Sequence, residues 1–506
     1  MESQTTDDSP ILWNVTAIVV GSVYLALALG TAATRQPWCD EAWFASPAAN
    51  LLESGTMGTS FIDTHDPIHK DISKYTYWQP PLYFLVQAVW YSLVGFSLFS
   101  MRALSTFWGL VLLISWLAIV RLLTENRWLA LLTVALIAVD YQFLANASDG
   151  RMDTMCAALA FAGYAFYLAL REHRLGSALL VSHTLVVASG LSHPNGILAF
   201  AGLVFLSLYL DRTRLRLRSI LFAVIPYMVG GLAWGWYIAK NPSAFFSQFG
   251  GNMSGRLYGL GSLWSGFKLE LTDRYLAAFG VGETTSPIAT LKLLVLGAYV
   301  AGWVGLMWEA QTAKRSAAVP AARNFRALVW LTTLYFLVMS VLIGNKSVSY
   351  LVHTVPLLAA CLAVWAGLLW VRRSVPVWTI SASLVFLFLL QLGGAGRRVL
   401  QDPYHKSYLP AVQFLKAALR EADAITGSAE LAFALGFRVN LADDPRLGYY
   451  TGKTPSLIVV EPRYKAWFER WRKEEPEVYR YVIQLLDEGY RQVYNNSFYQ
   501  ILERKK

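Results

Sequence analysis

Eleven long apolar runs divide the chain, and they limit its fold more strongly than any other feature of the sequence. A helix needs about 20 apolar residues to cross a bilayer, and fewer where flanking charged side chains reach back to the interface. We therefore expect eleven transmembrane helices. The runs lie at 11–31, 102–120, 128–145, 154–170, 177–191, 196–210, 219–239, 288–308, 327–343, 350–370 and 376–392.

The composition is that of a membrane protein. Of the 506 residues, 55% are hydrophobic and 15% are charged, whereas about a quarter are charged in soluble domains. The 19 tryptophans suit the aromatic belts of membrane interfaces. Residues 1–10 are acidic and polar, without the basic start of a cleavable signal, so 11–31 is predicted to be a retained helix. The three cysteines, Cys39, Cys156 and Cys361, form neither a metal-ligand nor a disulfide framework.

Positive charge is concentrated in alternate linkers, and this orients the predicted helices. Five short linkers hold 14 Lys and Arg in 44 residues, whereas the alternating set holds nine in 118. Such an asymmetry marks the first set as cytoplasmic. Because the charges are spread over five separate turns, the net charge of +10 does not indicate a nucleic-acid partner. The basic linkers are 121–127, 171–176, 211–218, 310–326 and 371–376.

One further apolar run, 81–96, is predicted to lie in the membrane plane. It is about 16 residues long, follows Pro80 and ends at Gly95, and it carries aromatic residues suited to an interface. Counting it as a span would move the basic linker 121–127 to the outside. Eleven spans instead place the C-terminus on the non-cytoplasmic side.

The composition changes near residue 397, where charges begin to occur throughout the sequence. We therefore predict an all-α polytopic membrane domain over 1–396, with a first exterior loop at 32–80, and a small exterior α/β domain over 397–506. Helical patterns lie at 409–422, 462–473 and 476–489, and strand patterns at 424–427, 457–461, 492–494 and 499–503.

The first exterior loop is long enough to be functional, and it opens with adjacent acids, Asp40 and Glu41. Paired carboxylates at a membrane face bind a cation, pair with one or move protons. The alternative is that both cap a solvated helix end. The loop closes on Lys74, Tyr77 and Gln79 before two prolines. These residues suit a sugar or phosphate site, and they suit an interfacial belt equally well.

Other polar groups fall on the same face by the charge argument. Asp149 and Asp153 stand four residues apart, and Arg151 either completes a site with them or simply neutralises them. His193 follows the predicted span 177–191, where it is either a site residue or a helix cap. Carboxylates beside such groups suit transfer from an anionic donor, because one acid can serve as base for an acceptor hydroxyl.

Cations on this face can balance a leaving phosphate. Lys346 and Tyr350 follow the predicted span 327–343, and Arg256 lies in the exterior loop 240–287. Lys346 is either a phosphate contact or a side chain that reaches the interface.

The order of these motifs resembles the GT-C superfamily of polyprenyl-phosphate-sugar transferases, especially the lipid A aminoarabinose transferases and protein O-mannosyltransferases. The resemblance covers most of 35–370. It is carried by Asp40-Glu41, Pro80-Pro81-Leu82, Arg102, Asp153, His193-Pro194-Asn195-Gly196, and the segment from Lys346 through Tyr350 to Pro356.

This resemblance implies that Asp40 is the catalytic base and that the donor is a sugar on a polyprenyl phosphate, usually transferred with inversion. The chain departs from the lipid A branch at Gln79, where those relatives have a phosphate-binding lysine. Lys74 or Lys346 would have to substitute. It also has His193 where relatives often have a lysine.

We therefore expect a glycosyltransferase of the plasma membrane, the inner membrane in a bacterium, acting on a hydroxyl of an exported lipid, glycan or protein. Glu41 and Asp153 are expected to orient the acceptor or, with Asp40, to hold a divalent cation. Tyr77, His193, Arg256 and Tyr350 are assigned to the donor. The alternatives are a lipid-linked glycan polymerase or ligase, and a lipid or glycan transporter. Transporters favour inverted repeats and charges at mid-membrane, which this sequence lacks.

Overall fold

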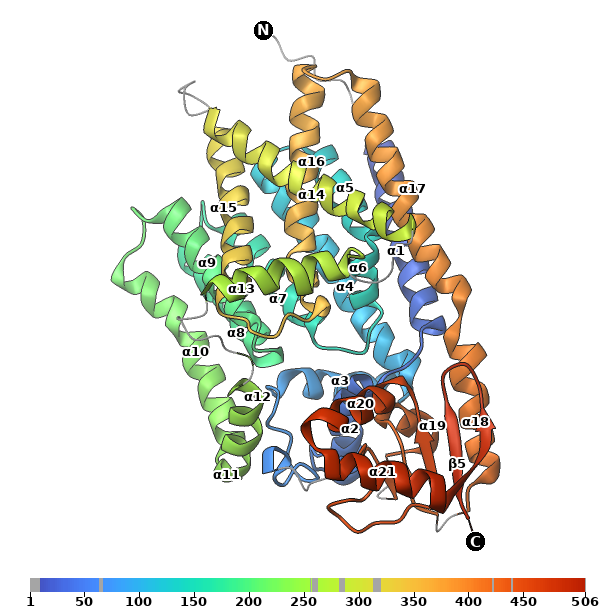
Figure 1. Cartoon of the computed structure of the whole chain (residues 1–506). Coiled ribbons are helices and arrows are strands. Elements are labelled where there is room, and N and C mark those ends of the chain that lie inside the picture. The colour runs from blue at the N-terminus through green and yellow to red at the C-terminus, as the bar shows by residue number, and fades with distance from the viewer. Residues whose placement is uncertain are drawn as a thin grey trace.

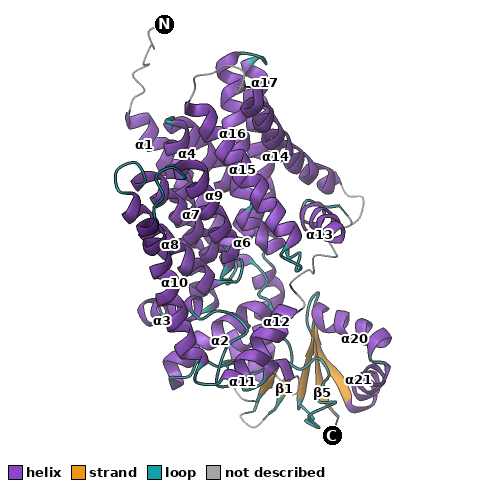
Figure 2. Ribbon diagram, turned by 90° about the vertical axis from the view of Figure 1, so that its left-hand side faces the viewer, coloured by secondary structure: helices purple, strands orange, loops and turns teal. Residues whose placement is uncertain are grey.

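The computed structural model describes residues 10–62, 67–254, 256, 263–281, 287–312, 320–420, 423–437 and 440–505. Helices form an elongated bundle, and the strands gather at one end of it (Figures 1 and 2). The same end carries α2 (Cys39–Ser54) and α3 (Leu82–Val94).

Within the described ranges, nine helices are long and apolar enough to cross a membrane. They are α1 (Pro10–Thr34), α4 (Leu98–Thr124), α7 (Asp153–Leu170), α8 (Leu175–Ser192), α10 (Leu217–Ile238), α14 (Pro287–Thr312), α15 (Pro320–Val341), α16 (Val355–Arg372) and α17 (Val377–Gln401). All nine lie where the sequence predicts spans, which confirms the polytopic helical fold.

The two remaining predicted spans differ from regular membrane helices. α5 (Arg127–Val139) and α6 (Tyr141–Ala147) form a tenth span only as a pair bent by 69°. The bend is at Asp140, whose Oδ1 accepts hydrogen bonds from the backbone N–H groups of Gln142 and Phe143 and so starts a new helix. α9 (Gly196–Asp211) is apolar but has only 16 residues.

Shorter helices connect the spans. α3 has 13 residues and lies across the bundle rather than along it, as predicted for 81–96 (Figure 1). The others are η1 (Pro67–His69), α11 (Pro242–Phe245), η2 (Phe246–Gly250), α12 (Gly251–Ser254), α13 (Leu263–Leu269), η4 (Glu270–Leu276) and η6 (Val348–His353).

A five-stranded sheet with order β2-β1-β3-β5-β4 forms the core of the C-terminal region. β1 pairs in parallel with β2 and β3, while β5 pairs antiparallel with β3 and β4. The strands are β1 (Ile425–Thr426), β2 (Leu441–Ala442), β3 (Leu457–Val460), β4 (Tyr490–Asn495) and β5 (Gln500–Arg504). The helices are η7 (Tyr404–Tyr408), α18 (Leu409–Ala418), η8 (Ala429–Leu431), α19 (Ala432–Leu435), α20 (Pro462–Glu474) and α21 (Pro476–Gly489).

Side-chain alternation along β3 gives the sheet two buried faces. Leu457 and Val459 pack with α18 and α19, whereas Ile458 and Val460 pack with α20 and α21. This confirms the predicted α/β region, although β2 was missed because two residues show no periodicity. No break in the chain marks the expected boundary after residue 396, since α17 continues to Gln401.

The C-terminal region contacts the first loop directly. The backbone N–H of Asp443 donates to the Phe61 carbonyl at 2.9 Å, and the Phe61 and Phe437 rings stack with centroids 5.5 Å apart. Gln36 also donates to the Tyr499 hydroxyl at 2.7 Å. The loop and the sheet region therefore enclose one end of the bundle together.

Candidate functional site

Glu41 lies at the centre of a buried ion pair. Its two carboxylate oxygens accept hydrogen bonds from Nε and Nη2 of Arg102, each at 2.6 Å, and both side chains are fully buried. The backbone N–H of Gly150 donates to the same carboxylate at 3.0 Å. Burial alone would raise the pKa of Glu41, but the Arg102 charge and hydrogen bonds hold it below its ordinary value. The pair joins α2 and α4 to the turn that precedes α7.

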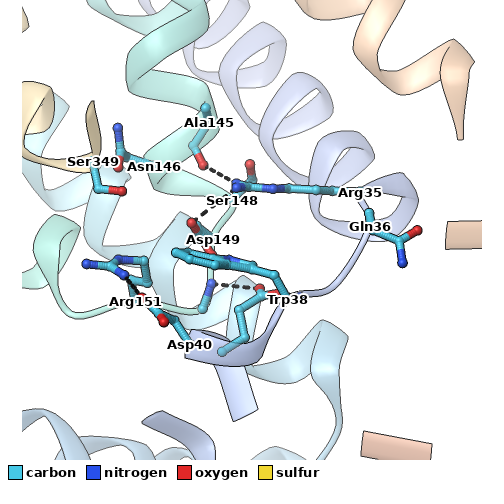
Figure 3. Close-up of polar contacts among 12 residues, drawn as sticks. Arg35, Gln36, Trp38, Asp40, Ala145, Asn146, Ser148, Asp149, Arg151 and Ser349 are labelled. Carbon is cyan, nitrogen blue, oxygen red and sulfur yellow. Dashed lines mark hydrogen bonds and ion pairs between the residues drawn. The ribbon is translucent and has the colours of Figure 1, made fainter. Parts of the chain in front are cut away.

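That turn packs closely against α4 at Gly150. A Cβ added at Gly150 would lie 2.6 Å from Sδ of Met101, so a larger residue there would require the buried Met101 side chain to shift. Asp149, the preceding residue, accepts a hydrogen bond from Trp38 Nε1 at 3.0 Å and pairs with Arg35 at 3.3 Å (Figure 3). Burial raises the pKa of Asp149 to about 6, and the negative charge of Glu41 adds to this while Arg35 opposes it.

Arg151 joins two of the three carboxylates predicted to be catalytic, Asp40 and Asp153. Its Nε contacts Oδ2 of Asp153 at 2.8 Å, and its Nη1 pairs with Oδ2 of Asp40 (Figure 3). The guanidinium also lies over the rings of Trp38 and Phe44, at 5.4 and 5.3 Å from their centroids. Arg151 therefore lies within the cluster of acids, where its two ion pairs fit both roles that the sequence left open.

The acids of this cluster differ sharply in accessibility. The Asp40 side chain is 24% exposed, whereas Glu41, Asp149 and Asp153 are at most 3% exposed. Asp40 stands in the first turn of α2, where a carboxylate is stabilised by the helix dipole. Among these four acids, only Asp40 is open to a substrate.

His193 and Tyr350 form the inner wall behind Asp153. Nε2 of His193 lies 3.9 Å from Oδ1 of Asp153, and its Nδ1 accepts a hydrogen bond from the Asn195 backbone N–H at 3.1 Å. The accepting Nδ1 assigns the proton of the neutral ring to Nε2, facing Asp153. Burial lowers the pKa of His193 to about 3, so the ring is neutral at physiological pH. The His193 and Tyr350 rings meet edge to face at 5.4 Å.

Cations surround Tyr350 on its other sides. Nη1 of Arg256 donates to the Tyr350 hydroxyl at 3.1 Å, and the Arg274 guanidinium lies 5.5 Å from the ring centroid. Arg274 and Lys346 share the buried carboxylate of Glu270, with Lys346 Nζ at 2.9 Å. The positive charges of Arg274 and Lys346 are thus balanced by only one negative charge, that of Glu270. Lys346 also donates to backbone carbonyls at the end of α15.

Three further residues of the first loop, Tyr77, Gln79 and Lys74, were predicted to bind the donor, and each has different contacts. Tyr77 donates from its hydroxyl to the Tyr237 carbonyl at 2.9 Å, and its backbone N–H donates to Gln248 at 2.7 Å. Tyr77 thus fastens the loop to α10. Gln79 is buried, and its Oε1 has no hydrogen-bond partner among the described residues. Lys74 is exposed.

A cavity of about 720 Å³ adjoins this cluster. Its walls come from the first loop, the segment around Arg256 and the C-terminal region, and they include Trp43, Trp78 and Trp467. Trp43 lies one turn after Asp40 on α2, and Arg256, which donates to the Tyr350 hydroxyl, lines the same cavity. Arg463 and Trp43 both contact the Asp443 carboxylate, at 3.2 and 3.0 Å.

The acids named as candidate metal ligands each face an arginine. Arg102 occupies Glu41, and Arg151 occupies both Asp40 and Asp153. Across the residues that the structure describes, no group of three or more His, Cys, Asp or Glu side chains is placed to hold a metal ion. The divalent cation remains a prediction from the sequence, and no step proposed below uses one.

Two residues of the site were not found from the sequence. Glu270 and Arg274 are buried in η4 and support Tyr350 and Lys346. Their spacing of four residues within an exterior loop was the available signal, but such a spacing is common on solvated helices.

Comparison with known proteins gives two kinds of match. Residues 78–234 match the family model described as dolichyl-phosphate-mannose-protein mannosyltransferase. No curated relative matches the chain significantly. Among solved structures, ArnT from Cupriavidus metallidurans bound to undecaprenyl phosphate matches with a TM-score of 0.59 at 14% identity, covering 98% of each chain.

Archaeal structures give further matches. The apo oligosaccharyltransferase from Archaeoglobus fulgidus has a TM-score of 0.57 at 10% identity, over 95% of this chain and 69% of that one. AglB from the same organism, in complex with an inhibitory peptide and a dolichol-phosphate, has a TM-score of 0.55 at 11% identity, over 90% and 70%. The family model over 78–234 describes a mannosyltransferase, and the solved structures share the fold of this chain. Together these matches confirm the resemblance and the glycosyltransferase class that the sequence predicts.

Proposed function

We propose that this membrane protein transfers a sugar from a polyprenyl-phosphate donor to a hydroxyl group of an exported lipid, glycan or protein, with Asp40 as the general base. The observation that carries the proposal is the accessibility of Asp40. It is the one exposed carboxylate of a four-acid cluster, and Arg151 and the start of α2 hold it in place. The undecaprenyl phosphate and dolichol-phosphate bound by similar structures support this class of donor.

The charges around the cluster are arranged for such a transfer. Near Asp40, two carboxylates share Arg151, which leaves one negative charge. Near Tyr350, the two positive charges of Arg274 and Lys346 face the single negative charge of Glu270, which leaves a net charge of about +1. Arg256 adds a further positive charge. A donor phosphate is therefore favoured beside Arg256, while the acceptor hydroxyl is favoured beside Asp40.

The reaction follows from this placement. The acceptor oxygen attacks the anomeric carbon as Asp40 takes its proton, and the bond from that carbon to the phosphate oxygen breaks. The polyprenyl phosphate leaves with its negative charge balanced by Arg256. A single displacement of this kind inverts the anomeric centre. Glu41 and Asp153 act as positioning residues, since both carboxylates are buried and paired with arginine, whereas Asp40 is partly exposed.

The acceptor is proposed to reach Asp40 through the 720 Å³ cavity. Its tryptophan faces suit the apolar faces of a sugar ring or an acceptor side chain, and the nearby Asp443 and Arg463 offer hydrogen bonds. The reaction would then take place on the non-cytoplasmic side, where the basic linkers place this end of the bundle.

The test is transfer in vitro by the purified protein, with a panel of synthetic polyprenyl-phosphate sugars and products read by mass spectrometry. Asp40→Asn should lower turnover about 10²- to 10⁴-fold, because the amide cannot accept the proton. The thermal stability of Asp40→Asn should stay unchanged, because aspartate and asparagine are equally suited to the start of a helix. Full turnover by Asp40→Asn would remove the assignment of the base.

A second variant tests the acceptor route. Trp467→Ala should raise KM for the acceptor while leaving KM for the donor unchanged, because Trp467 lines the cavity from the C-terminal region, where it stacks on Trp471. Trp378→Ala, an exposed tryptophan of α17, is the matched control. An unchanged acceptor KM in Trp467→Ala would exclude this cavity as the route.

A further inference from the structure

A second cavity lies on the outside of the bundle, between α14 and α17. Its volume is about 470 Å³, and its walls include the apolar side chains of Leu291, Val295 and Leu389. α17 runs along the edge of the bundle in Figure 1, and Leu389 is 64% exposed. The cavity therefore opens toward the region that lipid chains occupy around a spanning helix.

Three cations meet at this apolar cavity. Lys292 lies near the start of α14, and Arg397 and Arg398 lie near the end of α17. Lys292 Nζ and Arg398 Cζ stand 5.9 and 5.3 Å from the centroid of the Tyr141 ring. Within the part of the chain that the structure describes, none of the three forms an ion pair with an acidic side chain.

The acid beside these cations, Asp140, already has hydrogen-bond partners for both carboxylate oxygens. Asp140 is buried and accepts hydrogen bonds from the Tyr299 hydroxyl at 2.7 Å and from Gln391 at 2.8 Å. It also caps α6 through two backbone N–H groups. One buried carboxylate facing three cations leaves an excess of positive charge at the cavity.

The tendency of lysine and arginine side chains to extend to the membrane surface does not account for this arrangement. A lysine or arginine that only extends to the membrane surface needs no cavity beside it. Here Arg398 is held by a hydrogen bond from its Nη1 to the Tyr141 carbonyl at 3.0 Å. Gly393 and Gly394 line the same cavity, and a Cβ at either would meet nothing within 4 Å. The space in the cavity beside these two glycines is therefore open to a ligand.

We propose that this cavity binds one anionic phospholipid of the surrounding bilayer. The phosphate lies against Lys292, Arg397 and Arg398, and an acyl chain follows Val295 and Leu389. Basic pockets between spanning helices recognise acidic lipid headgroups in this way. The site is distinct from the Asp40 cluster, because none of the described residues that line this cavity belongs to the cluster or to the 720 Å³ cavity.

The experiment measures retention of phosphatidylglycerol by the detergent-purified full chain, using native mass spectrometry and thermal stability. The double variant Lys292→Ala/Arg397→Ala removes two cations but keeps the Arg398 hydrogen bond. We expect its affinity for phosphatidylglycerol to fall about tenfold or more. Phosphatidylcholine, which carries no net charge, should bind the wild-type protein weakly.

Lys240→Ala is the matched control. Lys240 lies two residues beyond the end of α10, and its Nζ stands 5.8 Å from the Tyr237 ring centroid. The substitution therefore removes one cation, with the same kind of ring contact as Lys292, away from the cavity. It should retain phosphatidylglycerol as the wild type does.

Three outcomes would overturn the proposal. They are equal binding of phosphatidylcholine, unchanged retention of phosphatidylglycerol by the double variant, and stoichiometric displacement of phosphatidylglycerol by polyprenyl phosphate. The last would assign the cavity to the donor. Loss of phosphatidylglycerol with an unchanged donor KM supports the proposal, and none of these binding results depends on whether the protein transfers a sugar.

Discussion

Arg151 and Arg102 decide what the acids of this site can do. Each guanidinium is buried and holds carboxylates that would otherwise be unpaired charges inside the protein. Adjacent residues in the sequence thus acquire different roles. Asp40 is partly exposed, whereas Glu41 is fully buried and joins three segments of the chain.

Glu41→Gln is expected to act on stability first. It removes one partner of a fully buried pair and leaves the Arg102 charge uncompensated, so unfolding should become easier by about 3–5 kcal/mol. Glu309→Gln provides the control, because Glu309 pairs with the exposed Arg372, and such a pair is worth about 0–1 kcal/mol. Thermal unfolding of both purified variants makes the comparison. Equal stability losses would contradict the interior role of Glu41.

Asp149 gives a prediction about pH. Its folded pKa of about 6 exceeds the ordinary value of 3.8, so the folded state binds the proton more tightly than the unfolded state. Its contribution to stability is therefore present at low pH and is lost as pH rises from about 4 to about 6. His193, with a folded pKa of about 3, acts in the opposite direction, and stability gained from it appears as pH rises toward 6.5.

A difference measurement separates the two groups. The stability of the wild type relative to Asp149→Asn should decrease between about pH 4 and 6 and stay constant above, because both proteins keep His193. Thermal unfolding at half-unit pH steps provides the data. A constant difference across the range would show that the Asp149 pKa is not raised.

At the scale of the elements, the break between α5 and α6 has the largest consequence for the site. α6 leads directly into the turn that carries Asp149, Gly150 and Arg151. Its direction is set by Asp140, which caps the helix and ties it to α14 and α17 through Tyr299 and Gln391. A straight helix through residue 140 would carry Arg151 away from α2.

Asp140→Ala should therefore lower both stability and turnover. The lost cap costs about 0.5–2 kcal/mol, and the unpaired Tyr299 and Gln391 add about 1–3 kcal/mol each. Asn126→Ala removes only a cap, at the start of α5, and should cost about 1 kcal/mol with turnover preserved. Unfolding and transfer assays on both variants test this. If Asp140→Ala is destabilised but keeps normal turnover, then the bend at Asp140 does not position the site.

For the whole molecule, the first loop and the C-terminal region form one enclosure around the cluster. The Asp443 carboxylate binds Arg463 of its own region and Trp43 of α2, and the contact with Trp43 spans 400 residues of sequence. The C-terminal region is thus a wall of the cavity, and it shares the end of the bundle that carries Asp40 (Figure 1).

Topology reporters test this arrangement across the membrane. Fusions at residues 153 and 450 should report the same non-cytoplasmic side, and a fusion at 124 should report the cytoplasm. A cytoplasmic signal at 450 would contradict the enclosure, because it would put the sheet region and Asp153 on opposite sides.

The sequence by itself determined the helical membrane fold, the α/β end and the position of Asp40, because hydropathy over 20 residues and charge in short linkers are local properties. It did not determine which carboxylate is open, since that depends on Arg102 and Arg151 arriving from other helices. Nor did it show Glu270 and Arg274 beneath Tyr350, or the cavity closed by Trp467. Burial and pairing arise only when segments far apart in the chain pack together, so these features were decided by the tertiary structure.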